Sequence, residues 1–483
     1  MFHYELSPTE FRRLRQHPAL PSAVGQCQER QLDYFDTPEA ALSGRGLLLA
    51  RVRCGWEWRM ELQASRPDAG LGWQAGLLAA GYCGPSGFDF DFVSDKELRL
   101  WLQKQTAQLQ RLGSEVIREE WLRVDTAAGA AGLRIERVEQ QSGTGRQSLV
   151  RLSFLPLENG DEAAFLLCRA LLAAFVMQPA MLSPAARIQQ AGTPLKSYRA
   201  KPSLPAGQDG RRAFLHIVRN CISHLCLNLP GLAVSDDPEF VHQARVAIRR
   251  LRSALKLFAP WLPQGFVTEF SARWRDMANG LGDCRNLDVF LAETLPLMER
   301  ELGAEDWLAR LKARAGRERQ RARRVARGML ASPEARLLVL DFEWALEHLT
   351  FPDAMPPLQK LARRRLVSRA RQVTRLGESV RDLDPQARHE LRIAFKKLRY
   401  ALEFFVGLFG EKRSQRYLAG LVDLQEVLGH LNDLATAQTL VHRLLPPATA
   451  RLPEAWLAGR VGALVDTLPT AVGHFLAAEP PWE

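Results

Sequence analysis

Short runs of alternating apolar and polar residues dominate the first third of the chain. Residues 47–53 and 56–62 form two such runs beside glycine-rich turns, and each is typical of a strand. Further candidate strands cover residues 120–124, 132–138 and 148–154. The apolar stretch at 162–177 is interrupted by Arg169 and is too short to span a bilayer, so it predicts a packed helix. This order indicates an α+β domain built on antiparallel strands.

A loop rich in proline, glycine and serine, at residues 193–210, separates this region from the rest of the chain. Beyond the loop, apolar residues follow helical spacing, candidate strands disappear and arginine becomes frequent. We therefore predict an N-terminal domain at 1–195, a linker at 196–210 and an all-α domain at 211–483.

The helical region contains an internal repeat. The segment His242–Phe258 recurs as His389–Phe405, and both ends are offset by 147 residues. A second pair, Leu281–Leu287 and Leu428–Leu434, has the same offset. Two matches in one register predict duplication of a whole helical unit, with copies at about 211–335 and 357–483.

Each repeated helix is expected to carry a charged stripe opposite an apolar face. At 100° per residue, the charged positions of the first copy fall within about 80° of one another. They are His242, Arg245, Arg249, Arg252 and Lys256. The second copy has His389, Arg392, Lys396 and Arg399 in these places. Glu403 replaces Lys256 there, so we expect the first copy to hold an anion more firmly.

A charged stripe on a helix is most often a solvated face. Here few acidic residues are interleaved, so ion pairs along the helix cannot neutralise it, and the arrangement occurs twice. Two such helices facing each other would form a positive groove. Arginine binds phosphate oxygens in bidentate fashion, and histidine adds a donor whose charged form an anion favours. The candidate binding residues are His242, Arg245, Arg249, Arg250, Arg252, Lys256, Arg285, His389, Arg392, Lys396, Lys397 and Arg399.

Overall charge supports an anionic partner. The net charge is +11, and residues from 201 onward hold 42 lysines and arginines against 32 acidic residues. Two arginine-dense stretches at 310–324 and 363–375 either extend the basic surface or form solvated faces. The seven cysteines include no CxxC pair and are typical of reduced thiols in a cytoplasmic protein. The first residues lack the pattern of a signal peptide.

The two repeated segments and the two Leu-Gly elements resemble the CHAD family, over about residues 205–483. The resemblance implies two pseudo-symmetric four-helix bundles with a basic channel that binds inorganic polyphosphate. It also implies association with polyphosphate granules, as in some members. The Leu-Gly element of the family commonly carries an Arg-Asp pair, whereas this chain has Arg285-Asn286 and Asn432-Asp433.

Residues 34–37 and 49–53 resemble the CYTH family, which has a closed antiparallel barrel around a triphosphate tunnel. In that family arginine and lysine bind triphosphate while glutamates hold a divalent metal. Here only Glu5 remains of the opening acidic motif, and Gln63 replaces a lysine. We therefore expect a degenerate barrel with no metal, cofactor or catalytic residue. An anion-binding tunnel is expected to be lined by Arg51, Arg53, Arg59 and Arg118.

Three functions follow as hypotheses. The leading one is polyphosphate binding by the helical domain of a cytoplasmic, granule-associated protein with no membrane partner. The alternative is a metal-dependent triphosphatase or polyphosphate hydrolase in the barrel. The third, nonspecific nucleic-acid binding, is disfavoured because the stripes contain few aromatic residues for stacking on bases.

Overall fold

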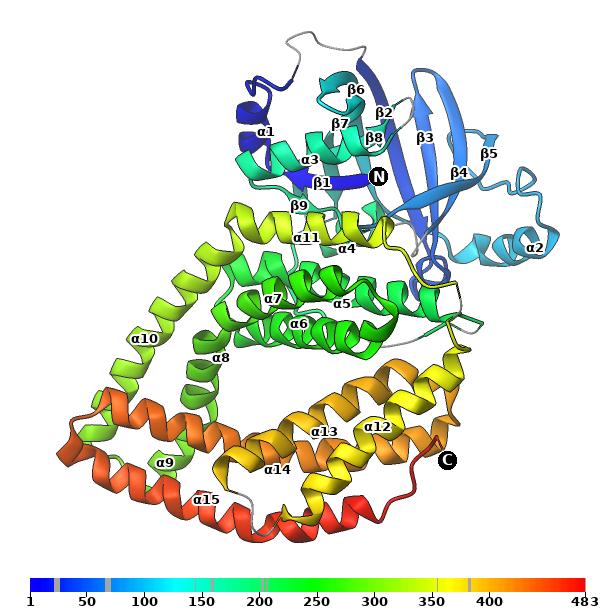
Figure 1. The fold of residues 1–483 in the computed structure, drawn as a ribbon. Coiled ribbons are helices and arrows are strands. Elements are labelled where there is room, and N and C mark those ends of the chain that lie inside the picture. The colour runs from blue at the N-terminus through cyan, green and yellow to red at the C-terminus, as the bar shows by residue number, and fades with distance from the viewer. Residues whose placement is uncertain are drawn as a thin grey trace. The chain divides into compact units, whose positions relative to one another are not determined.

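A computed structural model of the chain divides into two compact units (Figure 1). It describes residues 1–20, 27–65, 71–143, 145–157, 160–200, 204–205, 207–353, 355–380 and 384–482. The first unit contains Met1–Lys196 and Ala331–Glu347, and the second contains Ser197–Leu330 and His348–Glu483. The chain therefore leaves the second unit once and returns to it.

The first unit is built on a nine-stranded sheet, in the part of the chain that the structure describes. Its strands are β1 (Phe2–Leu6), β2 (Cys27–Asp36), β3 (Leu47–Cys54), β4 (Glu57–Ser65), β5 (Ala75–Tyr82), β6 (Gln110–Thr126), β7 (Gly129–Ser142), β8 (Gly145–Pro156) and β9 (Gln178–Pro179). Their order is β5-β4-β3-β2-β6-β7-β8-β1-β9, and every neighbouring pair is antiparallel. The predicted antiparallel α+β domain is confirmed.

The two edges of the sheet meet beside β5 and β9. The Trp73 amide N–H, just before β5, donates to the carbonyl oxygen of Ala180, just after β9, over 2.7 Å. Gly72 makes this approach possible, because a Cβ there would lie 2.9 Å from the Ala180 oxygen and its φ is +94°. The sheet therefore curls until its outermost segments join.

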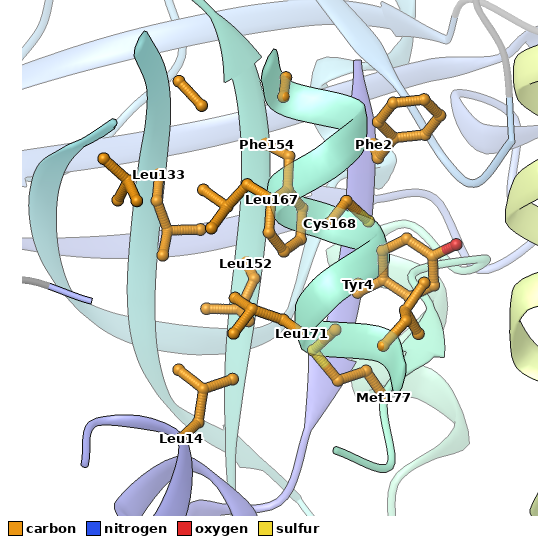
Figure 2. Packing of buried hydrophobic residues seen from close by; sticks show 14 of the residues in the cluster. Phe2, Tyr4, Leu14, Leu133, Leu152, Phe154, Leu167, Cys168, Leu171 and Met177 are labelled. Carbon is orange, nitrogen blue, oxygen red and sulfur yellow. The ribbon is translucent and has the colours of Figure 1, made fainter. Parts of the chain in front are cut away.

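Helices cover the sheet. They are α1 (Pro8–Leu14), α2 (Lys96–Gln105), α3 (Glu162–Ala174) and α4 (Pro184–Gln190), together with the short 3-10 turns Ser43–Arg45 and Thr106–Gln108. Leu167 and Leu171 of α3 pack against Leu152 and Phe154 of β8 (Figure 2). The predicted helix at 162–177 therefore packs in the protein, with its apolar face on the sheet.

One helix of the first unit comes from the region between the two repeats. Helix α11 (Pro333–Glu347) adds Leu340 to the α3 cluster, and its Trp344 stacks on Phe165 with ring centroids 4.4 Å apart. Arg336 of α11 donates to the carbonyl oxygen of Leu172. The sequence gives no sign of this packing, because the partner residues lie far apart in the chain, 164 residues apart for Arg336 and Leu172.

The second unit is all-α, as predicted. Its helices are α5 (Gly210–Val234), α6 (Pro238–Phe258), α7 (Gln264–Gly280), α8 (Gly282–Val289), α9 (Leu295–Leu302), α10 (Asp306–Leu330), α12 (Leu358–Glu378), α13 (Pro385–Phe405), α14 (Glu411–Leu444) and α15 (Pro447–Leu476). Both ends of α6 and α13 are offset by 147 residues, and so are the starts of α7 and α14. The long α14 corresponds to three shorter helices in the first copy, where a π-helical turn at Phe290–Thr294 joins α8 and α9.

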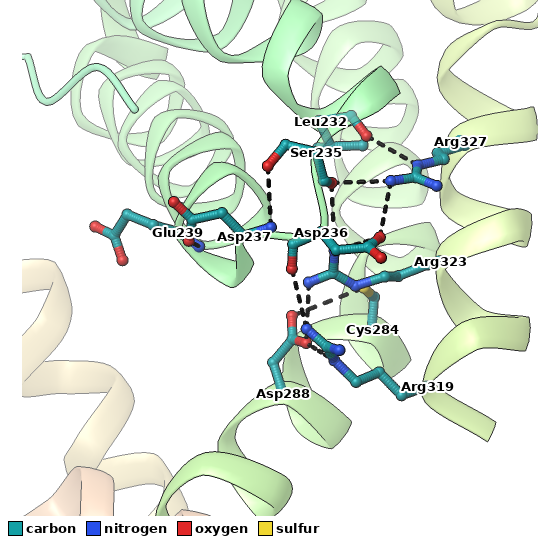
Figure 3. A network of polar contacts seen from close by, with 10 residues as sticks. All are labelled: Leu232, Ser235, Asp236, Asp237, Glu239, Cys284, Asp288, Arg319, Arg323 and Arg327. Atoms are coloured by element: carbon teal, nitrogen blue, oxygen red, sulfur yellow. Dashed lines mark hydrogen bonds and ion pairs between the residues drawn. The ribbon is translucent and has the colours of Figure 1, made fainter. Parts of the chain in front are cut away.

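An ionic network centred on the buried Asp288 holds the first copy together (Figure 3). Asp288 of α8 pairs with Arg319 and Arg323 of α10, and its side chain is 1% exposed. Arg323 and Arg327 also reach Asp236 in the turn between α5 and α6. These arginines are therefore neutralised within the protein, whereas Arg310, Arg317 and Arg321 on the same helix are exposed.

Helix α5 is long and apolar enough, by composition alone, to cross a membrane. However, 56% of its most apolar window is buried within the protein, and Phe214 and Ile222 of this helix are fully buried. Such burial is typical of the core helix of a bundle.

A cationic cavity between the two repeats

The local sequence fixes where the two repeated helices begin. Asp237-Pro238 and Asp384-Pro385 stand at their first turns, and each aspartate accepts a hydrogen bond from a backbone N–H of that turn. The caps satisfy otherwise unpaired donors, while proline at the first helical position is preset for the helix. Because the caps fix where α6 and α13 begin, His242 and His389 lie in the second turns of these helices.

The apolar faces of α6 and α13 are buried, as the helical wheel predicts. Ile248, Leu255 and Phe258 of α6 are fully buried, as are Phe395 and Phe405 of α13. The rings of Phe258 and Phe405 lie 6.1 Å apart, so the two repeats share one core at this point. Burial of these faces leaves the charged stripes to line the space between the helices.

That space is a cavity of about 730 Å³ within the second unit. Ten of the twelve predicted residues line it: His242, Arg245, Arg249, Arg252, Lys256, Arg285, His389, Arg392, Lys396 and Lys397. Arg369 of α12 also lines it and was not predicted from the sequence. Asp433 of α14 is the one acidic residue among the described lining residues, against nine lysines and arginines.

Arg250 and Arg399 are not among the lining residues. Both pair with Glu403, at 2.8 Å from Arg250 Nη2 and 3.4 Å from Arg399 Nε. Glu403 does not line the cavity either. Glu403, which takes the place of Lys256 in the second copy, therefore also pairs with one arginine of each repeat outside the cavity.

Among the described residues, the lysines and arginines of the lining form no ion pair with a carboxylate. The Nε atoms of Arg249, Arg252 and Arg392 are buried and have no hydrogen-bond partner among the described residues. Arg245 is anchored, since its Nη1 donates to the carbonyl oxygen of Ala278 over 2.7 Å. The side chains are thus held near one another without the carboxylates that usually satisfy buried arginines.

Burial and mutual repulsion disfavour the charged forms of these groups. Burial, followed by the charges of Arg392 and Arg249, lowers the pKa of Lys396 to about 6. Burial and then Arg285 lower the pKa of His242 to about 4, and burial and then Arg249 lower the pKa of Arg245 to about 10. Burial is also the main cause of a lowered pKa at Arg392, Lys256 and Arg369. A bound anion would relieve each of these costs.

The first unit contains a second, smaller cavity of about 410 Å³ inside its sheet. Its lining includes Arg30, Arg134 and Arg151 together with Glu5, Glu61 and Glu136. Arg151 is ion-paired with the buried Glu115, and Arg187 with Glu5. No described group of three or more histidine, cysteine, aspartate or glutamate side chains is placed to hold a metal ion. Unlike the larger cavity, this one largely neutralises its own charges.

None of the four arginines predicted for the tunnel lines this cavity. Arg51 donates to the carbonyl oxygens of Pro85 and Gly87, and Arg53 to that of Gly55. Arg59 pairs with Glu57, and Arg118 with Glu29 and Glu139. The predicted tunnel lining is therefore wrong. Arg151, on the predicted strand at 148–154, lines the cavity but is not among the predicted tunnel residues.

Comparison with known proteins identifies the helical region. The CHAD domain family model matches residues 216–442. The crystal structure of the CHAD domain from the plant Ricinus communis is 30% identical, covering 59% of this chain and 98% of its own, with a TM-score of 0.51. The chain belongs to the CHAD domain family. The matched range contains every residue that lines the larger cavity, so that cavity is a feature of the CHAD domain.

Two further solved structures are weaker likenesses. PptA from Streptomyces chartreusis is 16% identical, covering 56% of this chain and 99% of its own, with a TM-score of 0.43. HpAC1 from Hippeastrum, which has a dominant triphosphatase activity, is 14% identical, covering 40% of this chain and 96% of its own, with a TM-score of 0.27. Scores this low assign no activity to the chain. No curated protein matches it.

Proposed function

We propose that the CHAD domain binds inorganic polyphosphate in the cavity between α6 and α13. The observation that carries the proposal is the charge balance of the lining, which has nine lysines and arginines against Asp433. Burying cations without counter-charges is costly, so such a site is suited to an anion that supplies them. A phosphate polymer has a negative charge on every unit and can contact several of these cations at once.

The chemistry of the lining favours phosphate over other anions. Arginine presents two parallel donors to phosphate oxygens, and the Nε atoms of Arg249 and Arg392 are free to donate. Both repeats supply such donors, so a linear polymer can be held from two sides. A single carboxylate would satisfy only a small part of this donor set.

A triple variant tests the site. Arg249→Ala, Arg392→Ala and Lys396→Ala together remove three lining cations from both repeats. We expect at least a hundredfold loss of affinity for polyphosphate, because each charge-assisted hydrogen bond contributes about 1.5–3 kcal/mol. Isothermal titration calorimetry measures this loss, and helical circular dichroism confirms folding.

A charge-matched control separates the cavity from net charge. Arg310→Ala, Arg317→Ala and Arg321→Ala remove the same number of basic side chains from exposed positions of α10. This control should bind nearly as wild type at moderate salt, since distant surface charges are screened. Equal losses in both variants would reject the cavity as the binding site.

Nucleic acid is the competing polyanion. Duplex DNA is too wide to enter a cavity of about 730 Å³, whereas a single phosphate chain needs no room for bases. We expect DNA to displace bound polyphosphate poorly at equal phosphate concentration. Efficient displacement would instead favour nonspecific nucleic-acid binding.

The proposal also places the protein in the cytoplasm, on polyphosphate granules. A fluorescent fusion of the cavity variant should lose any granule localisation that the wild type has. The enzymatic alternative needs the first unit, where Glu5 is ion-paired with Arg187. Metal-dependent phosphate release from triphosphate that is lost on Glu5→Gln would establish that alternative.

A further inference from the structure

Helix α12 carries two basic faces. In its 21 residues, Leu358–Glu378, the helix has one lysine and six arginines but a single acidic residue, Glu378 at the end. Arg369 lines the cavity, and Arg365 donates to the carbonyl oxygen of Leu257 and lies over the ring of Trp261. Lys360, Arg363, Arg364 and Arg371 instead lie on the exposed side of the helix.

The exposed cations form one surface. At 100° per residue, Lys360, Arg364 and Arg371 fall within about 40° of one another, and Arg363 lies about 60° to one side. They line a shallow hollow of about 590 Å³ together with Val367 and Ser368. We name this set the outer α12 surface. Within the described residues, none of its four cations has an ion pair with a carboxylate, so their repulsion along the helix is not offset.

The internal repeat explains why this face is open. The corresponding face of α5 includes His224 and Asn228, which the segment before α5 covers. Asn228 exchanges two hydrogen bonds with the backbone of Tyr198, and the Tyr198 ring lies edge-on to His224 at 5.9 Å. The 147-residue offset maps Tyr198 onto Ala345 of α11, which belongs to the first unit. The counterpart of Tyr198 is therefore not part of the second unit, and the outer face of α12 is basic.

We infer that the outer α12 surface binds the part of a long polyphosphate chain that extends beyond the cavity. This inference rests on the proposed function, and it adds a chain-length preference. The two basic faces of α12 are joined by polar side chains, since Gln372 and Ser368 lie between Arg369 and Arg371 around the helix. A chain leaving Arg369 needs to pass about half the circumference of a helix roughly 10–12 Å wide. A short chain that fills the cavity cannot reach this surface.

A linear polyanion is the occupant that the charge pattern favours. The surface offers four cations without an interleaved carboxylate, which complements a chain charged at every unit. Val367 is the one apolar residue of the hollow, so the surface has little to offer an apolar protein partner. Contacts made by the end of a chain already held in the cavity gain from high effective concentration.

The test compares two probes on three variants that each lose three basic side chains, one of them the cavity variant. The outer variant is Arg363→Ala, Arg364→Ala and Arg371→Ala, and the α10 triple variant described above is its control. The probes are inorganic triphosphate, which is short, and long-chain polyphosphate. Exposed arginine-to-alanine changes on a helix should leave folding intact, because alanine has the highest helix propensity.

We expect the outer variant to bind long-chain polyphosphate ~10-fold more weakly than wild type, as the loss of three solvent-exposed ionic contacts implies. Its affinity for triphosphate should stay the same. The α10 control should bind both probes nearly as wild type. Unchanged affinity for the long chain, or an equal loss in the α10 control, would overturn the inference.

The cavity variant distinguishes this inference from the proposed function. If Arg249→Ala, Arg392→Ala and Lys396→Ala abolish triphosphate binding while the outer variant behaves as wild type with both probes, only the inference fails. If the cavity variant still binds triphosphate as tightly as wild type, the proposed function fails, and the inference fails with it.

Discussion

Glu403 of α13 binds Arg250 of α6 through one carboxylate oxygen, which lies 2.8 Å from Nη2 and 3.2 Å from Nε of the guanidinium. The other oxygen lies 3.4 Å from Nε of Arg399. The two side chains of the Arg250–Glu403 pair are 14% and 15% exposed, so the pair is largely desolvated. One carboxylate thus joins the two repeats and supplies a counter-charge to two arginines outside the cavity.

Glu403→Gln should destabilise the second unit. The change leaves two partly buried guanidinium groups without a counter-charge, and breaking such a pair costs about 2–4 kcal/mol. Urea unfolding followed by helical circular dichroism measures the change. Glu301→Gln, which removes an exposed pair with Arg460, is the control and should cost less than about 1 kcal/mol. Similar losses in both variants would show that the Glu403 pair behaves as a surface contact.

Polyphosphate binding should take up protons through Lys396. The pKa of this lysine is lowered to about 6 by burial and by Arg392, Arg249 and Arg399, with Asp433 opposing them. A bound anion raises this pKa toward its ordinary value, so the complex holds more protons than the free protein above pH 6. Affinity should therefore fall as pH rises from about 6 through the pKa of the complex.

Calorimetry in two buffers tests this uptake. At a pH above 6, binding heats should differ between buffers with different ionisation enthalpies, in proportion to the protons taken up. Lys396→Arg keeps a positive charge but holds its proton, so it should reduce the difference. Identical heats in both buffers for the wild type would contradict the lowered pKa of Lys396.

Much of this site was predictable because its causes are local. The spacing of Arg245, Arg249 and Arg392 with respect to apolar residues predicts which side of each helix is buried, and the repeat predicts that two such helices belong together. The structure places these residues in one cavity. Helical periodicity depends on neighbours a few positions apart, which the sequence contains.

The errors arise where distant residues decide the outcome. Arg250 is removed from the cavity by Glu403, which lies 153 residues away in the sequence. In the sheet, Leu48 lines the interior while Leu49 packs outside against other apolar residues, so both faces of β3 are apolar. Alternation along such a strand cannot indicate which face is inside, and Arg51, expected in the tunnel from the resemblance, does not line the interior.

Asp288→Asn should disrupt the network between α8 and α10. Asp288 is 1% exposed and accepts from Arg319 and Arg323, and Arg323 is itself 3% exposed. Asparagine keeps the shape but removes the charge, so a buried arginine loses its main counter-ion at a cost of about 3–5 kcal/mol. Thermal unfolding should show the loss, whereas Asp276→Asn, in an exposed pair with Arg275, should change stability little. A small effect at Asp288 would assign the stabilising role to Asp236 instead.

Asp433→Asn should strengthen polyphosphate binding. Asp433 is the one carboxylate among the described lining residues, and its charge repels a bound phosphate chain. It also favours the charged forms of Arg392 and Lys396, so its removal lowers the pKa of both groups further in the free protein. The two effects oppose each other at neutral pH, because a more neutral Lys396 must gain a proton on binding. Well below pH 6, where Lys396 is charged in both proteins, only the removal of repulsion remains, and affinity should rise ~5-fold or more, as expected for the loss of a nearby like charge in a partly buried site. The gain over wild type should therefore shrink as pH rises through neutrality.

Titration at two pH values, with Asp423→Asn on α14 as a control outside the lining, measures this trend. A gain that does not change with pH would show that Asp433 does not act through Lys396.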